Sequence, residues 1–145
     1  MKKNLMKTNC YDVEKVMVIV GSCLDKMQPE AYKELTEVSD ILYDVCLEET
    51  HINMAIAKII GMICRTNINK IVFATVDKSP HCIQLHYIEN EIRKAMDITN
   101  ISIVHFVAVD NKLIEISSET INKSKCLSEL EKMRVWIIWI LWGDF

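Results

Sequence analysis

Residues 70–96, KIVFATVDKSPHCIQLHYIENEIRKAM, decide the fold because an apolar run is followed at once by a helix-like segment. The run 70–76 is typical of a buried strand. Ser79 is suited to cap a helix and Pro80 to occupy its first position. At about 100° per residue, one arc of that helix carries Leu85, Ile88, Ile92 and Ala95. The stretch therefore predicts a strand, a tight corner and a helix packed on the sheet.

Strand-like and helix-like segments alternate on both sides of this unit. Residues 16–20 form a β-branched apolar run that ends at Gly21, as expected of a strand buried on both faces. Helical spacing predicts helices over 29–49 and 51–67, and His51 lies at the start of the second. Residues 101–109 read as a third strand. The pair Asp110-Asn111 then predicts a turn into a short edge or hairpin strand near 113–117.

The alternation determines the fold class. Parallel strands are usually joined by right-handed crossovers through helices. We therefore predict a three-layer α/β sandwich with a mostly parallel sheet, Rossmann-like or flavodoxin-like, with an antiparallel edge strand. Ser118 would cap a mostly polar helix over residues 118–133. Residues 1–133 are expected to form one domain.

The composition and the absence of certain motifs limit the classes of partner that the chain is expected to bind. The 145 residues include 17 Lys and Arg against 20 Asp and Glu, without a basic block, so we expect no nucleic-acid partner. No GxGxxG or GxxxxGK[ST] pattern occurs. Residues 1–15 contain no apolar stretch typical of a secretory signal, and the six cysteines form no CxxC pair. Free thiols in a reducing cytoplasm are the expectation.

The end of the chain, RVWIIWILWGDF at 134–145, differs from everything before it. Residues 135–142 are all apolar and include all three tryptophans, but the run is far shorter than the roughly 20 residues of a transmembrane helix. We expect no transmembrane segment. One interpretation is a final strand or helix turn packed on the body. The others are a dimer or membrane-surface contact, or an end that does not belong to the native reading frame.

Chemistry-bearing residues follow two of the predicted strands. Cys23 and Asp25 come after the first strand, and His81 and Cys82 come after the second. In open parallel sheets, ligands bind beyond the carboxyl ends of the strands. If the two strands are neighbours, these side chains lie on one rim, with Asp110 at the end of the third strand. The rim is therefore our candidate site for a small molecule or a metal ion.

The helix predicted after Ser79 indicates which of these residues could act as a nucleophile, a base or a metal ligand. Cys82 would lie in its first turn, where the helix dipole favours a thiolate. Helical spacing places His86 one turn further on the same stripe, which continues through Glu89 and Arg93. A thiol and an imidazole at this spacing can act as nucleophile and base or as metal ligands.

The candidate roles form three sets. For a catalytic site we predict Cys82, His86 and the orienting carboxylate Asp25; for cofactor contacts, Ser22, Lys78 and Ser79; for a zinc or iron–sulfur centre, Cys23, Cys82 and His81. The alternative is that Cys23 and Cys82 are inert small residues. Cys46, Cys64 and Cys126 are interpreted as core or flank residues, and His105 as a hydrogen-bonded interior histidine.

The layout resembles the zinc-binding core of β-class carbonic anhydrases. Those proteins place Cys-x-Asp-x-Arg after one parallel strand and His-x-x-Cys after the next. Here Cys23-Leu24-Asp25-Lys26 and the pair His81-Cys82 stand in those places. The arginine is missing and the histidine and cysteine are adjacent, so neighbouring helical residues would point about 100° apart. The resemblance concerns layout only and implies no activity.

A second hypothesis belongs to another class of function. The chain would be a non-catalytic ligand-binding or oligomerisation module without a metal. Ile83 and Tyr87 lie on the side of their helix away from the core arc, so they and the tryptophan-rich end could form a homo-oligomer contact.

Overall fold

A six-stranded sheet forms the centre of the molecule. The computed structural model describes residues 1–9 and 13–143. The sheet order is β1-β3-β2-β4-β5-β6, with only β6 antiparallel to its neighbour in this part of the chain. The strands are β1 (Lys2–Asn4), β2 (Val16–Gly21), β3 (Leu42–Val45), β4 (Lys70–Val76), β5 (Ser102–Val109) and β6 (Lys112–Ile116). The predicted three-layer α/β fold with an antiparallel edge strand is confirmed.

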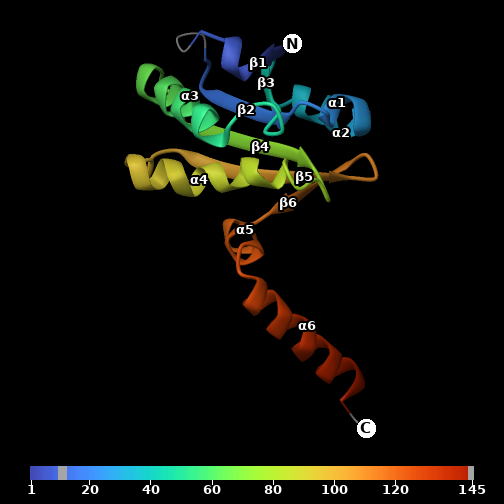
Figure 1. Cartoon of the computed structure of the whole chain (residues 1–145). Coiled ribbons are helices and arrows are strands. Elements are labelled where there is room, and N and C mark those ends of the chain that lie inside the picture. Colours follow the sequence, from blue (N-terminus) through green and yellow to red (C-terminus); the bar gives the residue numbers. More distant parts are fainter. Residues whose placement is uncertain (10–12, 144–145) are drawn as a thin grey trace.

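Helices cover both faces of this sheet. One core joins it to α3 (Ile52–Arg65) and α4 (Ile83–Ala95), and includes the buried side chains of Ile59, Phe73 and Ile88. The second core joins the opposite face to α1 (Leu24–Met27) and α2 (Pro29–Thr36). The remaining helical segments are the 3₁₀ turn η1 (Leu5–Lys7), α5 (Ser118–Ser124) and α6 (Leu127–Trp142). Figure 1 shows α5 and α6 running away from the sheet below β6.

The strand order places a topological switch point between β2 and β4. From β2 the chain moves to β3 on one side, and α3 then returns it to β4 on the other side of β2. The pairs Val18↔Val72 and Val20↔Ala74 put these two strands in direct register. Loops at the carboxyl ends of such strands diverge and leave a crevice where ligands bind in open α/β sheets. The segments after Gly21 and after Val76 therefore meet at one rim, as the sequence hypothesis required.

The hairpin between β5 and β6 is a two-residue turn. Asp110 and Asn111 have φ angles of 50° and 59°. Positive φ at both central positions matches a type I′ turn, whose twist fits that of the flanking strands. Asparagine and aspartate tolerate this region better than other residues with a side chain. The predicted turn and edge strand are confirmed.

Two strands differ from the sequence prediction. The helix predicted over 29–49 is wrong, because α2 ends at Thr36 and Leu42–Val45 forms β3. Tyr32, Leu35, Val38 and Leu42 have helical spacing, but Val38 is exposed and Leu42 lies in the sheet. Burial of β3 between β1 and β2 outweighs the local helical pattern. Sequence reasoning also missed β1, which has only three residues and extends the parallel edge.

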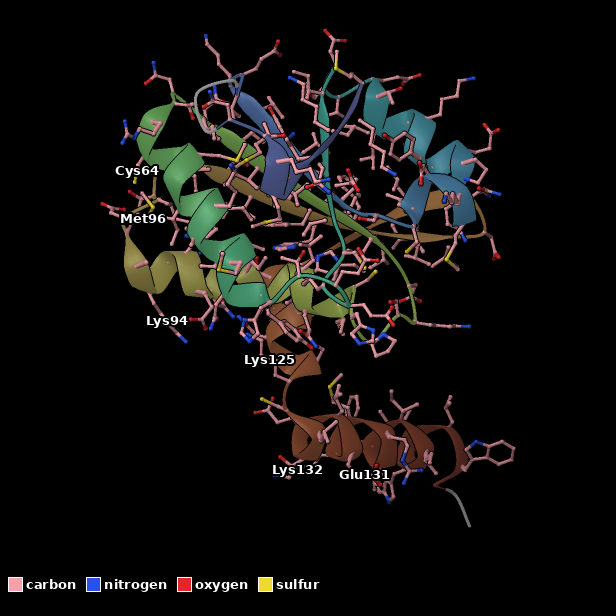
Figure 2. The ribbon with its side chains drawn as sticks, turned by 45° about the horizontal axis from the view of Figure 1, so that its top comes forward. Cys64, Lys94, Met96, Lys125, Glu131 and Lys132 are labelled. Carbon is pink, nitrogen blue, oxygen red and sulfur yellow. The ribbon has the colours of Figure 1, made fainter. Side chains whose placement is uncertain are left out.

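The C-terminal helices also differ from the prediction. The helix predicted over 118–133 is divided into α5 and α6, and its cap is Ser117, whose side chain accepts a hydrogen bond from the Thr120 N–H. No residue of α6 is buried, so the apolar end is not packed on the body. Figure 2 shows α6 as a separate rod that carries Glu131 and Lys132. Within residues 1–9 and 13–143, no helix is both long and apolar enough to span a bilayer.

Candidate functional site

The corner between β4 and α4 is held by Ser79. Its hydroxyl oxygen accepts a hydrogen bond from the Cys82 N–H at 3.2 Å, and its carbonyl accepts one from the Ile83 N–H at 3.2 Å. Ser79 therefore makes the predicted hydrogen bond, but the prediction of a helix from Pro80 with Cys82 in its first turn is wrong, because α4 begins at Ile83 and Cys82 is its N-cap residue. Lys78, just before it, has a φ of 65°, a conformation that costs a residue with a side chain on the order of 1 kcal/mol. The corner is thus a tight and defined turn.

Cys23 and Cys82 come together at this rim. Their Sγ atoms are 4.0 Å apart, and both side chains are partly buried. Gly21 makes the approach feasible, since a β-carbon there would lie 3.2 Å from the Cys82 sulfur. Burial, and then the neighbouring Cys82, raise the pKa of the Cys23 thiol. At neutral pH Cys23 therefore remains a protonated thiol.

Cys46 is a third thiol near this pair. It follows β3 directly and is close enough to Cys23 to affect its titration. The interpretation of Cys46 as a residue on a helix is wrong, because residues 42–45 form a strand. By contrast, Cys64 lies exposed near the end of α3 that leads to the amino end of β4 (Figure 2). Cys126 is exposed at the start of α6.

The predicted partners Ser22 and Asp25 are engaged elsewhere. The Ser22 hydroxyl donates a hydrogen bond to Asp44 Oδ2 at 2.8 Å. Asp25 Oδ2 forms an ion pair of 2.9 Å with the Lys2 ammonium group, which lowers the pKa of Asp25. These contacts connect the rim to β1 and β3. Asp25 is therefore held by Lys2, and its other carboxylate oxygen, Oδ1, has no hydrogen-bond partner among the described residues.

The three residues of the predicted metal site are not assembled as a ligand set. Across the described ranges 1–9 and 13–143, no group of three or more His, Cys, Asp or Glu side chains is placed to hold a metal ion. His81 is exposed, while Cys82 beside it is partly buried. Adjacent residues in a helical turn diverge, which explains the separation. The zinc layout suggested by the carbonic anhydrase resemblance does not form among these residues.

A buried polar chain lies beside the thiols. His86 Nε2 is 2.8 Å from Thr75 Oγ1, and His86 Nδ1 is 3.0 Å from His105 Nδ1. His105 Nε2 is 2.5 Å from Glu89 Oε2. The exposed fractions of His86, Glu89 and His105 are only 3%, 4% and 1%. His86 thus shares the predicted stripe with Glu89, but its partners are Thr75 and His105 and not Cys82.

The sequence contained part of the signal for this chain. The helical stripe of His86, Glu89 and Arg93 was visible, and Arg93 does pair with Glu89 at 2.9 Å. His105 is hydrogen-bonded and buried, as expected. Its place opposite the stripe follows from the register Phe73↔His105 between β4 and β5, which the sequence does not specify. The Phe73 and His105 rings also stack, with centroids 5.3 Å apart.

Two pockets flank the corner. A pocket of ≈ 520 Å³ lies on the Cys23 side and is lined in part by Gln28, Lys78 and Asp110. A pocket of ≈ 390 Å³ lies on the His86 side, between β5, β6, α4 and α5. Both are bordered by residues 76–79. Predicted contact residues Lys78 and Ser79 thus face two distinct spaces.

The predicted oligomer surface on α4 is covered within the chain at Tyr87 but not at Ile83. The Tyr87 hydroxyl is 3.0 Å from Ser124 Oγ, and the Lys125 ammonium group lies 4.6 Å from the centre of the Tyr87 ring. Ile83 lines the pocket on the His86 side. The expected apolar surface is therefore wrong for Tyr87, because α5 packs against α4 there, whereas Ile83 remains 39% exposed.

Acid is expected to destabilise the protein through His86. Burial, and then His105, lower the pKa of His86 from 6.5 to about 3. Between these values the unfolded chain binds the proton and the folded chain does not, so stability falls as pH falls. The loss at pH 4 is about 3 kcal/mol. Urea unfolding between pH 7 and pH 4 should show this slope.

The same experiment has a matched pair of variants. His86→Gln should remove most of the slope over this pH range, whereas His81→Gln, at an exposed histidine, should keep the wild-type slope. Equal slopes for both variants would contradict a buried neutral His86.

The fold and the switch-point site define a doubly wound α/β protein, with Cys23 in the loop after β2, where a glycine-rich phosphate loop stands in dinucleotide-binding members of that architecture. A family model described as a Rossmann-like domain matches residues 13–135, and the chain belongs to this family. Comparison with curated proteins and with solved structures gave no significant match.

Proposed function

We propose that the protein is a thiol-redox protein in which Cys23 and Cys82 form a dithiol that exchanges with small disulfides. The observation that carries the proposal is the 4.0 Å separation of the two sulfur atoms at the switch point. A disulfide bond is about 2.05 Å long, so closing it needs a movement of about 2 Å, within reach of side-chain rotation and a small loop shift.

The surroundings of each sulfur support different roles. Cys82 is the N-cap residue of α4 and lies in the corner that Ser79 holds, and we assign it as the attacking group. The protonated Cys23 is the resolving group. The pocket beside Cys23 gives room for a small disulfide, and its lining of Lys78 with Asp77 and Asp110 suits one that carries both ammonium and carboxylate groups, such as oxidised glutathione.

The proposed thiol–disulfide exchange takes place in two steps. The Cys82 thiolate attacks one sulfur of the small disulfide, forms a mixed disulfide and releases one thiolate. Cys23 then loses its proton, attacks the Cys82 sulfur and releases the second thiolate. The small disulfide gains two electrons and leaves as two thiolates, and the protein, counted from the Cys82 thiolate, loses two electrons and one proton.

Equilibration in glutathione redox buffers tests the proposal. We expect one reversible two-electron transition, measured by trapping the remaining thiols with an alkylating reagent and counting the added groups by intact mass. Cys23→Ser and Cys82→Ser should each abolish it. Cys64→Ser, at an exposed cysteine far from the rim, should leave it unchanged. A transition that survives in Cys82→Ser would refute the assignment.

A further inference from the structure

The pocket on the His86 side combines apolar walls with one polar end. Its walls include Val76, Pro80, Ile83, Val107, Ile116 and Ile121, contributed by β4, the corner, α4, β5, β6 and α5. Thr75 and His86 also line it, and these two side chains are buried and bonded to each other. Asp77 and Lys78 lie at its border on the corner. A ligand in this pocket would therefore meet the Thr75–His86 pair.

Glu89 sets the direction of the hydrogen bonds behind that pair. Its carboxylate accepts from Arg93 Nε at 3.0 Å and from the Ser118 hydroxyl at 3.0 Å. These donors and His105 lower the pKa of Glu89 to about 2 despite its burial. An ionised carboxylate only accepts, so the His105 Nε2–H must donate to Glu89 Oε2. The proton between the two Nδ1 atoms is the one that can move.

The chain then has two complete arrangements. In the neutral one, His86 Nδ1–H donates to His105 Nδ1, and the Thr75 hydroxyl donates to His86 Nε2. In the other, His105 carries an additional proton and donates to His86 Nδ1, and His86 Nε2–H donates to Thr75 Oγ1. The Thr75 hydrogen then points away from His86, toward the pocket. The two arrangements differ by one proton, and every hydrogen bond from Thr75 to His105 reverses.

We propose that this pocket binds a small, mainly apolar molecule with an acidic hydroxyl group, a phenol or an enol, and that Thr75, His86 and His105 take up its proton. The ligand hydroxyl gives its proton to Thr75 Oγ1. Thr75 passes its own proton to His86 Nε2, and His86 passes the Nδ1 proton to His105. The ligand becomes an anion and His105 a cation, while Thr75 and His86 each end with the number of protons they began with.

Charge in the surroundings favours this separation. The positive charge on His105 lies 2.5 Å from the Glu89 carboxylate, and Arg93 is the other charged partner of that carboxylate. Burial keeps His86 neutral, so it transmits the proton and does not retain it. Lys78 brings a positive charge to the border where the ligand anion forms, with Asp77 beside it. The apolar walls select against strongly polar or multiply charged ligands.

Titration with para-nitrophenol tests the proposal, because its phenol and phenolate forms absorb at different wavelengths. At a pH one unit below the pKa of the free probe, the bound probe should show a phenolate-to-phenol ratio at least about tenfold above that in solution, a shift of one pKa unit. Thr75→Val keeps the shape of the side chain and removes the hydroxyl, so the ratio should return to the solution value. His105→Phe should do the same while the probe still binds.

Thr120→Val is the matched control, because Thr120 lines the same pocket outside the chain of hydrogen bonds, and its ratio should equal that of the wild type. Thermal unfolding of each variant establishes that it is folded, and Thr75→Val alone decides if His105→Phe does not fold. The proposal is overturned if the wild type gives no saturable absorbance change. It is also overturned if folded Thr75→Val keeps the wild-type phenolate ratio.

Discussion

Glu89→Gln should lower the free energy of unfolding by about 3–5 kcal/mol at neutral pH, because it removes the one anion from a buried charged network. Arg93, Ser118 and His105 all hydrogen-bond to this carboxylate, and only 6% of its side chain is exposed. The amide nitrogen of glutamine is a donor, and it would face groups that also donate. Such a loss is a large part of the stability of an ordinary domain, about 5–15 kcal/mol.

Urea unfolding followed by circular dichroism measures this effect. Glu91→Gln is the matched control on the same helix, because Glu91 pairs with Lys94 at the surface. Exposed pairs contribute little, so this variant should remain within about 0.5 kcal/mol of the wild type. A similar loss for both variants, or a loss below about 1 kcal/mol for Glu89→Gln, would show that the network does not stabilise the fold in the way its geometry indicates.

Oxidation of Cys23 and Cys82 should raise the free energy of unfolding by about 4 kcal/mol. The two residues are 59 positions apart in sequence, and the chain-entropy model gives this value for a loop of that length. Strain from the movement needed to close the bond would reduce it. For a chain of this size the midpoint of thermal unfolding should rise by about 10 °C.

Differential scanning calorimetry of the oxidised and reduced forms checks the value. Cys64→Ser should show the full increase, and Cys23→Ser should show none after the same oxidation. A lower midpoint for the oxidised protein would mean that the bond distorts the rim, which is not expected for sulfurs already 4.0 Å apart.

Sequence patterns were sufficient for the longer strands in the interior of the sheet, of which β2 and β4 are almost fully buried and β5 is half-buried. Residues 16–20, 70–76 and 101–109 are continuous apolar or β-branched runs, and burial and local propensity favour the same structure there. The edge elements were not predictable in the same way. β1 has three residues, and β3 follows a helix whose apolar spacing continues by chance into the strand. Their pairing is a tertiary effect that no local window contains.

The candidate site shows the same limit. The rim and its two cysteines were predictable, because they depend on strand ends and on the corner at Ser79. Asp25 was assigned to the thiols only because it is near Cys23 in sequence, but its partner Lys2 lies on the missed strand β1. The contact between His86 and His105 depends on the register of β4 and β5 and on how α4 lies across them. The spacing of residues along the chain determines neither the register of β4 and β5 nor the placement of α4.

Peptide mapping of the oxidised protein is the most direct measurement of the central claim, that Cys23 and Cys82 form the reactive pair. After treatment with oxidised glutathione and proteolysis without reduction, mass spectrometry should find one internal cross-link, between the peptides that contain Cys23 and Cys82. Cys64 and Cys126 should carry at most single glutathione adducts. A dominant link between Cys23 and Cys46, or no internal link at all, would contradict the account.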